Sequence, residues 1–451
     1  MAQLIFIVLI AAVAYLTLKK FRHLRADILL GAEYVPQSSI MQRWQNVILI
    51  AFGQRKMFQN FTPAILHFFI YSAFLLTQIE LIEIVIDGVF GTHRVFANAL
   101  GSFYYFTIST IEMLSVLALV ATFAFLYRRN LLKVPRLVKS ELNGWPKLDA
   151  NLILIGEILL ITGIFTMNGA DSMLQQINPA HYPSTGTLPI SSWLGPMLFG
   201  GMDVITLEAV ERFGWWLHLL VVLSFVLYLP FSKHLHIFLS FPNVYFANTK
   251  PRGEMENMPA IMHEVKSMLG LENGESYNVS VSDELPKFGA NDVSDLTWKN
   301  IMDSFSCTEC GRCTAACPAN ITGKKLSPRK IMMDVRDRAT EVGQKNRSGK
   351  TEFILKDANI SDALTKDNFH DGKSLFDYIT KEEIRACTTC NACVDACPVL
   401  IDPLDIILKL RRYEILTESA GPPDWTPMFT ALENQGSVWQ MPQERAAWMQ
   451  S

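Results

Sequence analysis

The feature that most constrains this chain of 451 residues is a cysteine spacing that occurs twice near its C-terminal end. Both copies read C-x2-C-x2-C-x3-C-P and together use all eight cysteines: Cys307, Cys310, Cys313 and Cys317, then Cys387, Cys390, Cys393 and Cys397. This run is typical of proteins that hold cubane iron–sulfur clusters through cysteine thiolates. Structural zinc sites instead use two ligand pairs with a longer gap between them. The sequence therefore predicts two 4Fe-4S clusters.

In a pair of such runs, the fourth cysteine of each run ligates the cluster of the other run. The expected ligands of the first cluster are Cys307, Cys310, Cys313 and Cys397. Those of the second cluster are Cys387, Cys390, Cys393 and Cys317. No cysteine is left for a disulfide framework, which predicts that this half of the chain faces a reducing compartment.

The rest of the chain has the composition of a membrane protein. Half of all residues are hydrophobic, and the apolar residues are concentrated before residue 241. The mean hydropathy is positive, at +0.20. Because a bilayer crossing takes about 20 apolar residues, we predict a membrane domain over residues 1–240. Its five expected spans lie at about 4–18, 61–86, 102–126, 152–167 and 213–240.

Basic residues follow the odd-numbered spans. After the first and third spans they are Lys19, Lys20, Arg22 and Arg25, then Arg128, Arg129, Lys133, Arg136 and Lys139. Lys233 lies near the end of the fifth span. The positive-inside rule then predicts a multi-pass protein of the cell's inner (cytoplasmic) membrane, with its N-terminus outside and everything after residue 240 in the cytoplasm. Because no basic segment precedes the first span, we interpret it as a retained anchor.

The fifth span carries two histidines, His218 and His236, which are eighteen residues apart. In one continuous helix this spacing makes five turns, so both rings would share a face, roughly 27 Å apart along the axis. His234 would lie nearly opposite. Paired imidazoles in a membrane helix indicate axial ligands of haem b. His67, early in the second span, is the expected partner of His236 on the cytoplasmic side.

Two interpretations stand for His93, which follows the second span. Gly88 and Gly91 would let the chain turn His93 back into the bundle as the partner of His218, near the outer face. Alternatively, His93 is an exposed loop residue. One haem b is therefore expected, and a second is an open alternative.

Several charged residues fall inside or close to the spans. The carboxylates are Glu80, Glu83, Glu112 and Glu157. Because a charge inside a bilayer is costly, these groups either exchange protons during quinone chemistry or are protonated acids bonded to a neighbouring helix. Arg94 and Lys233 lie near the expected haems, and each either binds a quinone oxygen or is a surface charge.

The predicted fold class is all-α: a five-helix transmembrane haem b bundle followed by a cytoplasmic α-helical ferredoxin-like domain. Residues 241–295 are expected to form a connector, 296–418 the two-cluster domain, and 419–451 a tail that docks onto a partner. The segments SPRKIMMDV and DPLDIILKLRR predict helices that hold the clusters, since each has proline at the start and an apolar face. A net charge of -3 gives no signature of nucleic-acid binding.

Two family resemblances follow from these motifs. WWLHLLVV followed by LPFSKHLHIF is similar to the last span of the gamma subunit of respiratory nitrate reductases, a family with five spans and two b haems. This resemblance implies His67, His218 and His236 as haem ligands. The family's second ligand on the second span falls near Thr77, where this chain has no histidine.

The soluble half resembles the iron–sulfur subunits of heterodisulfide reductases and glycolate oxidases, through the cysteine runs, the SPRKIM segment and the ENQG-x-W tail. The two halves together resemble the heterodisulfide-reductase-like membrane iron–sulfur oxidoreductases. The catalytic part of those enzymes carries cysteine-rich CCG motifs, which this sequence does not contain.

The expected function is that of an electron-transfer subunit between a membrane quinone (menaquinone or ubiquinone), haem b and the two clusters. No residue indicates a catalytic nucleophile, a flavin site or a nucleotide loop, so substrate chemistry is expected on a separate partner. That partner is a CCG-type redox subunit, an electron-transfer flavoprotein or a hydroxy acid oxidase, and either direction of electron flow is open. The alternative is a membrane redox sensor or assembly protein whose clusters report the quinone state without turnover.

Overall fold

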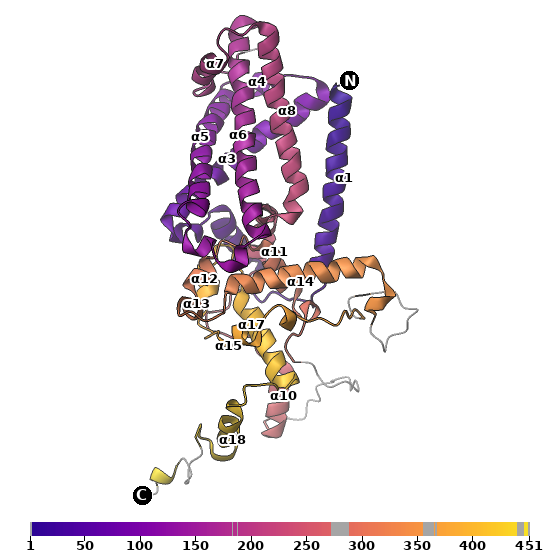
Figure 1. Cartoon of the computed structure of the whole chain (residues 1–451), viewed down its shortest axis with the longest axis vertical. Helices are drawn as coiled ribbons and strands as arrows, with labels where there is room; N and C mark the ends of the chain where they lie inside the picture. The colour runs from indigo at the N-terminus through magenta and orange to yellow at the C-terminus, as the bar shows by residue number, and fades with distance from the viewer. Residues whose placement is uncertain are drawn as a thin grey trace.

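The computed structural model describes residues 2–182, 184–186, 188–271, 288–354, 365, 368–439 and 446–449. Five long helices run in roughly the same direction, and the shorter helices of the C-terminal half gather at one end of them (Figure 1). The long helices are α1 (Ala2–Ile28), α3 (Phe61–Phe90), α5 (Ser102–Asn130), α6 (Trp145–Ile177) and α8 (Val204–Tyr228). All five are long and apolar enough to cross a membrane. The prediction of five such helices is confirmed. Four of them extend beyond their predicted spans, whereas α8 begins before residue 213 and ends well before residue 240.

Small residues allow α6 and α8 to pack closely. A Cβ atom added at Gly214 would lie 2.5 Å from the backbone nitrogen of Met167. One added at Gly163 would lie 2.9 Å from the backbone nitrogen of His218. Such close approach is the usual way in which membrane helices gain contact, since lipid gives no hydrophobic drive between them. Helix α1 stands at the edge of the bundle and contacts α3 and α8.

The fifth span is not one continuous helix. Helix α8 ends at Tyr228, and two short 3-10 turns (Leu229–Phe231 and Lys233–Leu235) lead into α9 (His236–Tyr245). The expectation that His218 and His236 share one face of a single helix is therefore wrong. The physical reason is the sequence LPFS: Pro230 has no amide hydrogen to donate, and Ser232 adopts an extended conformation with φ -120° and ψ 166°.

Short helices cover both ends of the bundle. At the end away from the C-terminal domain, referred to below as the outer end, are α4 (Val95–Leu100) and α7 (Ser191–Phe199). At the other end are α2 (Ile40–Asn46), a π-helical segment (Val47–Phe52) and 3-10 turns (Met57–Gln59, Pro135–Leu137 and Ser140–Leu142). The connector contains α10 (Pro259–Met268), and its residues 272–287 lie outside the described part.

The C-terminal domain is helical as predicted. Helix α14 (Pro328–Ser348) lies across the end of the bundle (Figure 1) and contains the SPRKIM segment, with Ser327 as its N-cap. Helix α17 (Pro403–Arg412) is the second expected helix. The remaining helices are α11 (Trp298–Ser306), α12 (Arg312–Ala316), α13 (Pro318–Ile321), α15 (Lys381–Arg385), α16 (Ala392–Ala396) and a π-helical segment (Tyr413–Thr417). Three 3-10 turns complete it (Val293–Asp295, Thr351–Phe353 and Leu375–Asp377), while 355–364 lies outside the described residues.

Within the described residues, the pairing of extended segments is limited to two isolated bridges, Ala32 with Thr297 and Ile354 with Phe369. The prediction of an all-α chain is confirmed for this part. The main hydrophobic core belongs to the C-terminal domain, yet it includes Leu24, Leu229 and Leu235 from the membrane half. The two halves therefore share one core where they meet.

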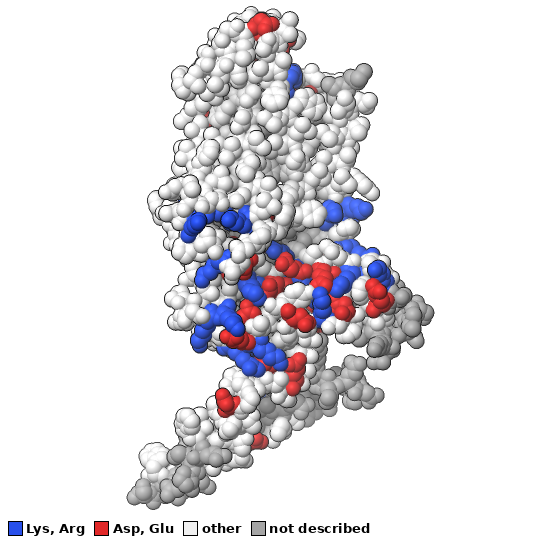
Figure 2. Space-filling view, in the orientation of Figure 1, with Lys and Arg blue, Asp and Glu red and all other residues white. Residues whose placement is uncertain are grey.

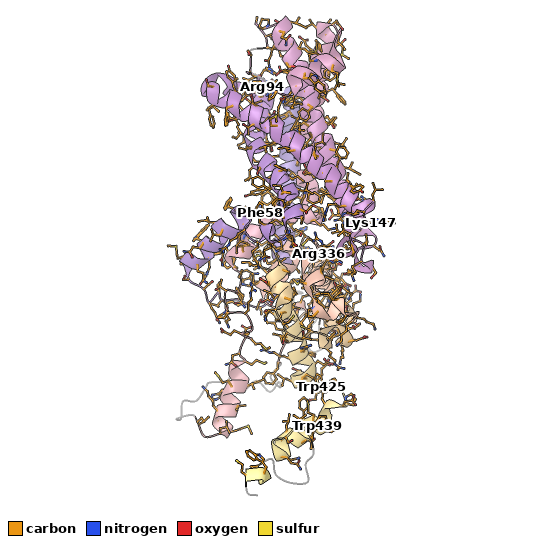
Figure 3. All side chains as sticks on the ribbon, turned by 90° about the vertical axis from the view of Figure 1, so that its left-hand side faces the viewer. Phe58, Arg94, Lys147, Arg336, Trp425 and Trp439 are labelled. Carbon is orange, nitrogen blue, oxygen red and sulfur yellow. The ribbon has the colours of Figure 1, made fainter. Side chains whose placement is uncertain are left out.

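Charge separates the two halves (Figure 2). The surface around the long helices is almost free of charge, basic side chains gather where this surface ends, and both signs are mixed over the C-terminal domain. Beyond that domain, α18 (Trp425–Gln435) and a 3-10 turn (Ala447–Met449) extend away from the rest. Trp425 and Trp439 lie in this extension (Figure 3), and residues 440–445 of the predicted tail are not described.

Candidate functional site

The eight cysteines line two separate cavities in the C-terminal domain. The first cavity is lined by Cys307, Cys310, Cys313 and Cys397. The second is lined by Cys317, Cys387, Cys390 and Cys393. Each cavity thus combines three cysteines of one run with the fourth cysteine of the other, which is the crossed arrangement that the spacing predicts. The exchange follows from the packing of α12 against α16, which contain Cys313 and Cys393, the third cysteine of each run.

The two cysteine loops have the same local conformation. Glu309 and Thr389, at matching positions, have φ values of 54° and 56°. The backbone amide of each donates a 3.4 Å hydrogen bond to the sulfur of the cysteine two residues before it. Asn391 adopts a left-handed conformation in the second loop, which asparagine tolerates better than most residues. These amides point toward the sulfurs, as they do where they tune a bound cluster.

Burial disfavours the ionised form of these thiols. Burial raises the pKa of Cys307 and of Cys397 to about 12. As free groups they would remain protonated at neutral pH, whereas cluster iron requires the thiolate. Among the described residues, no three His, Cys, Asp or Glu side chains converge as the ligands of a single ion would. Four sulfurs spread around a cavity instead suit the separate corners of a cubane.

The two cavities differ in their surroundings. The first lies against the membrane half, because Arg136 from the segment after α5 donates a 2.7 Å hydrogen bond to the carbonyl of Cys310. Arg312, which lines the first cavity, donates to the carbonyl of Met57, just before α3, at 3.2 Å. In the second cavity, Cys390 is exposed to solvent. The first cavity therefore faces the bundle, and the second opens to the outside of the domain.

His67 and His236 meet at the end of the bundle that touches the C-terminal domain. Their ring centroids lie 6.5 Å apart. Two imidazoles that share one metal ion, with metal–nitrogen bonds of about 2 Å, have centroids roughly 6 Å apart. His236 Nδ1 donates a 2.7 Å hydrogen bond to the carbonyl of Lys233, and His67 Nδ1 is buried without a hydrogen-bond partner. The bond to the Lys233 carbonyl fixes the orientation of the His236 ring and leaves its Nε2 free to bind a metal.

His234 is also close to His236, with ring centroids 6.5 Å apart. The expectation that His234 lies on the opposite face is therefore wrong, because the two residues belong to a 3-10 turn and the start of α9 and not to one helix. His234 is only two residues from His236 in the chain, whereas His67 approaches from α3. His67 is therefore the histidine that meets His236 from a separate long helix.

The structure does not bring His93 against His218. His218 packs against Gly163 and donates from Nδ1 to the carbonyl of Leu160 at 3.3 Å. His93 Nε2 donates to Asp171 at 3.2 Å. Asp171 lies eight residues beyond Gly163 on α6, which is about 12 Å along the axis. The two histidines are therefore at different depths of the bundle, and His93 belongs to a polar cluster at the outer end.

The membrane half and the first cysteine loop are joined by a buried ion pair. Lys233 Nζ lies 2.8 Å from Glu309 Oε2 and 3.3 Å from Asp149 Oδ2. The second oxygen of Glu309 pairs with Arg336 at 2.7 Å. Burial alone would raise the pKa of Glu309, but Lys233 and Arg336 outweigh it and hold this pKa below its ordinary value. Lys233, the same residue whose carbonyl binds His236, therefore connects the histidine pair to the first cavity.

The charges near the spans are more buried than a surface interpretation allows. Arg94 and Lys233 are both in buried ion pairs, so the surface-charge alternative is wrong for each. Glu112 accepts hydrogen bonds from the backbone of Ile190 and from the Ser191 hydroxyl. Glu83 accepts bonds from Tyr104 Oη at 2.7 Å and from the Phe96 amide at 2.9 Å. Both carboxyl groups are therefore hydrogen-bonded to neighbouring segments of the chain.

Sequence reasoning missed the pairing of Lys233 with Glu309. One signal for it exists in the repeat, because the first loop reads CTEC where the second reads CTTC. The extra carboxylate marks the loop that meets a cation of the membrane half. The sequence does not identify this cation as Lys233, because Lys233 reaches Glu309 from the short turn that interrupts the fifth span after α8.

Comparison with known proteins agrees with the cysteine cavities. Residues 306–401 match the family model described as a 4Fe-4S dicluster domain. The chain is 29% identical to the probable iron-sulfur-binding oxidoreductase FadF of Bacillus subtilis, over 99% of this chain and 60% of that protein. It is 24% identical to the EtfAB:quinone oxidoreductase of Syntrophomonas wolfei, over 97% of this chain and 58% of the relative.

A third relative, a probable membrane-anchored ferredoxin of Chromohalobacter salexigens, is 32% identical over 30% of this chain and 20% of its own length. No solved structure matches the chain. The chain spans about three fifths of the length of the first two relatives. Together, the dicluster domain, the five apolar helices and the iron–sulfur oxidoreductase relatives support an electron-transfer role for a membrane protein with 4Fe-4S clusters.

Proposed function

We propose that this chain is a membrane-anchored electron-transfer subunit that carries electrons between a quinone pool, haem b and two cytoplasmic 4Fe-4S clusters. The observation that carries the proposal is the line of contacts from the second cysteine cavity to the first, and from Glu309 through Lys233 to His236 and His67. This line ends at the membrane on one side and at exposed Cys390 on the other. An electron carrier between a membrane and a soluble partner requires both ends.

His67 and His236 would hold the inner haem. The haem supplies a centre that accepts and releases one electron at a time. The protein would supply one imidazole from α3 and one from the start of α9, and it orients His236 through the carbonyl of Lys233. His218, with its own bond to a backbone carbonyl, remains the predicted ligand of a second haem. In this structure it lacks a facing histidine at its depth among the described residues.

The partner would be a soluble redox protein that docks near the second cluster. One relative is named for its action on EtfAB and quinone, which favours an electron-transfer flavoprotein among the three partner classes. Menaquinone or ubiquinone would be the membrane partner, and both directions of electron flow remain within the proposal. Catalysis on an organic substrate would take place on the partner.

The proposed topology places the C-terminal domain in the cytoplasm of a cell bounded by an inner membrane. Basic side chains gather at the end of the apolar surface that meets the cysteine domain (Figure 2). Cytoplasmic ends of membrane helices are enriched in Lys and Arg. The N-terminus of α1 lies at the opposite end and would be outside.

The experiment that tests the proposal measures cofactors in anaerobically purified protein. We expect iron and acid-labile sulfide for two clusters of four irons, and a b-type alpha band in the reduced-minus-oxidised spectrum. His236→Ala is expected to remove the inner haem band and to leave cluster iron unchanged. His181→Ala, a change at an exposed histidine of the outer loop, is the matched control and should keep both. A full haem band in His236→Ala would contradict the ligand pair.

A further inference from the structure

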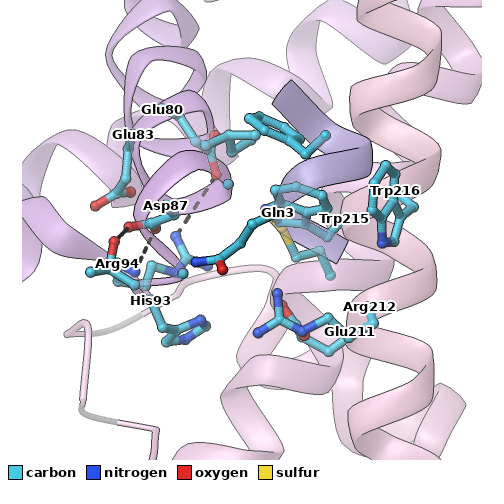
Figure 4. A pocket seen from close by; sticks show the side chains of 16 residues that line it. Gln3, Glu80, Glu83, Asp87, His93, Arg94, Glu211, Arg212, Trp215 and Trp216 are labelled. Carbon is cyan, nitrogen blue, oxygen red and sulfur yellow. Dashed lines mark hydrogen bonds and ion pairs between the residues drawn. The ribbon is translucent and has the colours of Figure 1, made fainter. Parts of the chain in front are cut away.

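A cavity of about 260 Å³ lies between α1, α3 and α8 at the outer end of the bundle (Figure 4). One wall is apolar and largely aromatic, and its members are Phe6, Ile84, Met167, Trp215 and Trp216. The other wall carries polar groups from α3, from the turn after it and from α8: Glu80, His93, Arg94, Glu211 and Arg212. This cavity is distinct from the inner histidine pair and from both cysteine cavities.

Glu80 is the one side chain of this wall whose two oxygens are both buried without any hydrogen bond, among the described residues. Only 2% of its surface is exposed. Its nearest cation is Arg94, with NH1 at 3.8 Å, beyond hydrogen-bond distance. A buried carboxyl that makes no hydrogen bond is destabilising. Such a group is retained where a ligand or an incoming proton completes it.

Glu211 is nearly as buried, at 1% exposure. Its Oε2 atom lies 3.2 Å from Arg212 Nε, but the geometry is that of an ion pair and not of a hydrogen bond. Figure 4 shows the carboxyl of Glu211 on the α8 side of the cavity and that of Glu80 on the α3 side. The cavity therefore has an incompletely bonded carboxyl on each side.

Arg94, a cation of the polar wall, is held in place before any ligand binds. Arg94 NH2 donates to Asn168 at 2.6 Å and to Asp171 at 3.2 Å. The backbone at Arg94 has a φ of 54°, a strained value for a residue other than glycine. Asp87 stabilises this conformation by accepting a 2.7 Å hydrogen bond from the Arg94 amide. Strain and rigid donors of this kind are typical of a preorganised binding site.

We propose that this cavity binds the head group of a quinone or quinol, with Glu80 bonded to one of its two oxygens. The proposal rests on the proposed function, because quinone is the membrane partner there. A flat aromatic ring suits the wall that contains Trp215 and Trp216. A buried carboxylic acid donates a hydrogen bond to a quinone carbonyl, and a carboxylate accepts one from a quinol hydroxyl.

The size and place of the cavity agree with this ligand. Pockets for whole drug-sized molecules are about 300–1,000 Å³, so this cavity suits a head group whose isoprenoid tail remains in lipid. Phe6 from α1, the helix at the edge of the bundle, forms part of its wall. A metal cation is disfavoured as the ligand because the guanidinium groups of Arg94 and Arg212 also line the cavity.

The test is the calorimetric titration of the anaerobically purified full chain with menadione, a naphthoquinone without a long tail. Glu80→Leu is expected to weaken binding by roughly tenfold, the equivalent of one well-made hydrogen bond. Glu157→Leu makes the same change at a half-buried carboxyl of α6 outside the cavity wall, and is the matched control. It should leave the dissociation constant within about twofold of the wild type.

Trp216→Leu is the second variant, because a half-buried tryptophan is replaced there without the loss of a buried carboxyl. It should also weaken menadione binding, through the lost aromatic contact. Unchanged binding in both cavity variants, or equal weakening in Glu157→Leu, would overturn the proposed site. Haem and iron content separate this result from a failure of the proposed function, which would appear as missing cofactors in the wild type.

Discussion

At the scale of single residues, two features define the candidate site: the eight cysteines around the two cavities, and the ion pair of Lys233 with Glu309 beside them. A covalent ligand pattern is local, so the spacing alone indicates which eight residues gather and in which two sets. The depths of His67 and His236 in their spans also predict their pairing, although the fifth span is broken at Pro230 and Ser232 and is not one continuous helix. The contact of Lys233 with Glu309 could not be predicted in this way, because it depends on that break and on the docking of two domains.

The Lys233 contact leads to a prediction for Lys233→Met. Loss of a buried positive charge between the cluster loop and the haem ligand disfavours the reduced, more negative haem. We expect the midpoint potential of the haem to fall by about 60 mV, which corresponds to about 1.4 kcal/mol for one electron. A spectroscopic redox titration measures this, with haem and iron content as checks on folding.

Lys233→Arg is the matched control, since it retains the charge beside Glu309 and Asp149. Its potential should remain close to the wild-type value. A wild-type potential in Lys233→Met would show that this ion pair only supports the fold.

At the scale of elements, helices with strong local signals were predictable, and their ends and breaks were not. The apolar runs and the proline-led segments indicated α3, α5, α14 and α17, whose bounds then extended through polar flanks that carry no membrane signal. The cavity between α1, α3 and α8 could not be predicted, because it depends on how three helices lean against each other. The sequence indicates carboxylates at this depth of the spans, but it does not indicate which side chains lie beside them.

Helix α14 is fastened to the domain by an ion-pair network that can be tested by stability. Arg338 is fully buried and pairs with Asp292 and with Asp371, the latter at 2.7 Å and also in contact with Lys345. Breaking a buried pair from one side leaves a charge without its partner. We expect Asp371→Asn to lower the free energy of unfolding of this domain by about 3 kcal/mol, measured as earlier loss of cluster absorbance in denaturant.

The pair of Arg338 with Asp371 also makes the free energy of unfolding of this domain depend on pH. Burial alone would raise the pKa of Asp371, but hydrogen bonds from Arg338 and Lys345 outweigh it and hold the pKa below its ordinary value. The stabilisation is therefore complete above the unfolded-state pKa, about pH 4, and is lost as the pH falls through the folded-state pKa. Asp337→Asn, which changes an exposed carboxylate of α14, should have little effect on the free energy of unfolding. Equal effects of the two variants would contradict this account of α14.

At the scale of the whole molecule, composition alone divided the chain correctly into an apolar half and a charged half. The sequence did not indicate that the two halves share one hydrophobic core, with Leu24 and Leu229 packed into the cysteine domain. That shared core holds the first cysteine cavity against the bundle, while the second cavity faces away from the bundle. Figure 3 shows the resulting order, with Arg94 at one end of the bundle, Arg336 at the other, and Trp425 and Trp439 beyond it.

The central claim is that electrons pass between the membrane and the clusters through the histidine pair of the inner site. The most direct measurement adds a short-chain menaquinol to the anaerobic, oxidised protein and follows the b-type alpha band together with the electron paramagnetic resonance signal of the clusters. The account predicts that both signals appear in the wild type, and that in His236→Ala the clusters are no longer reduced although their iron is retained. Cluster reduction at the wild-type rate in His236→Ala would contradict it.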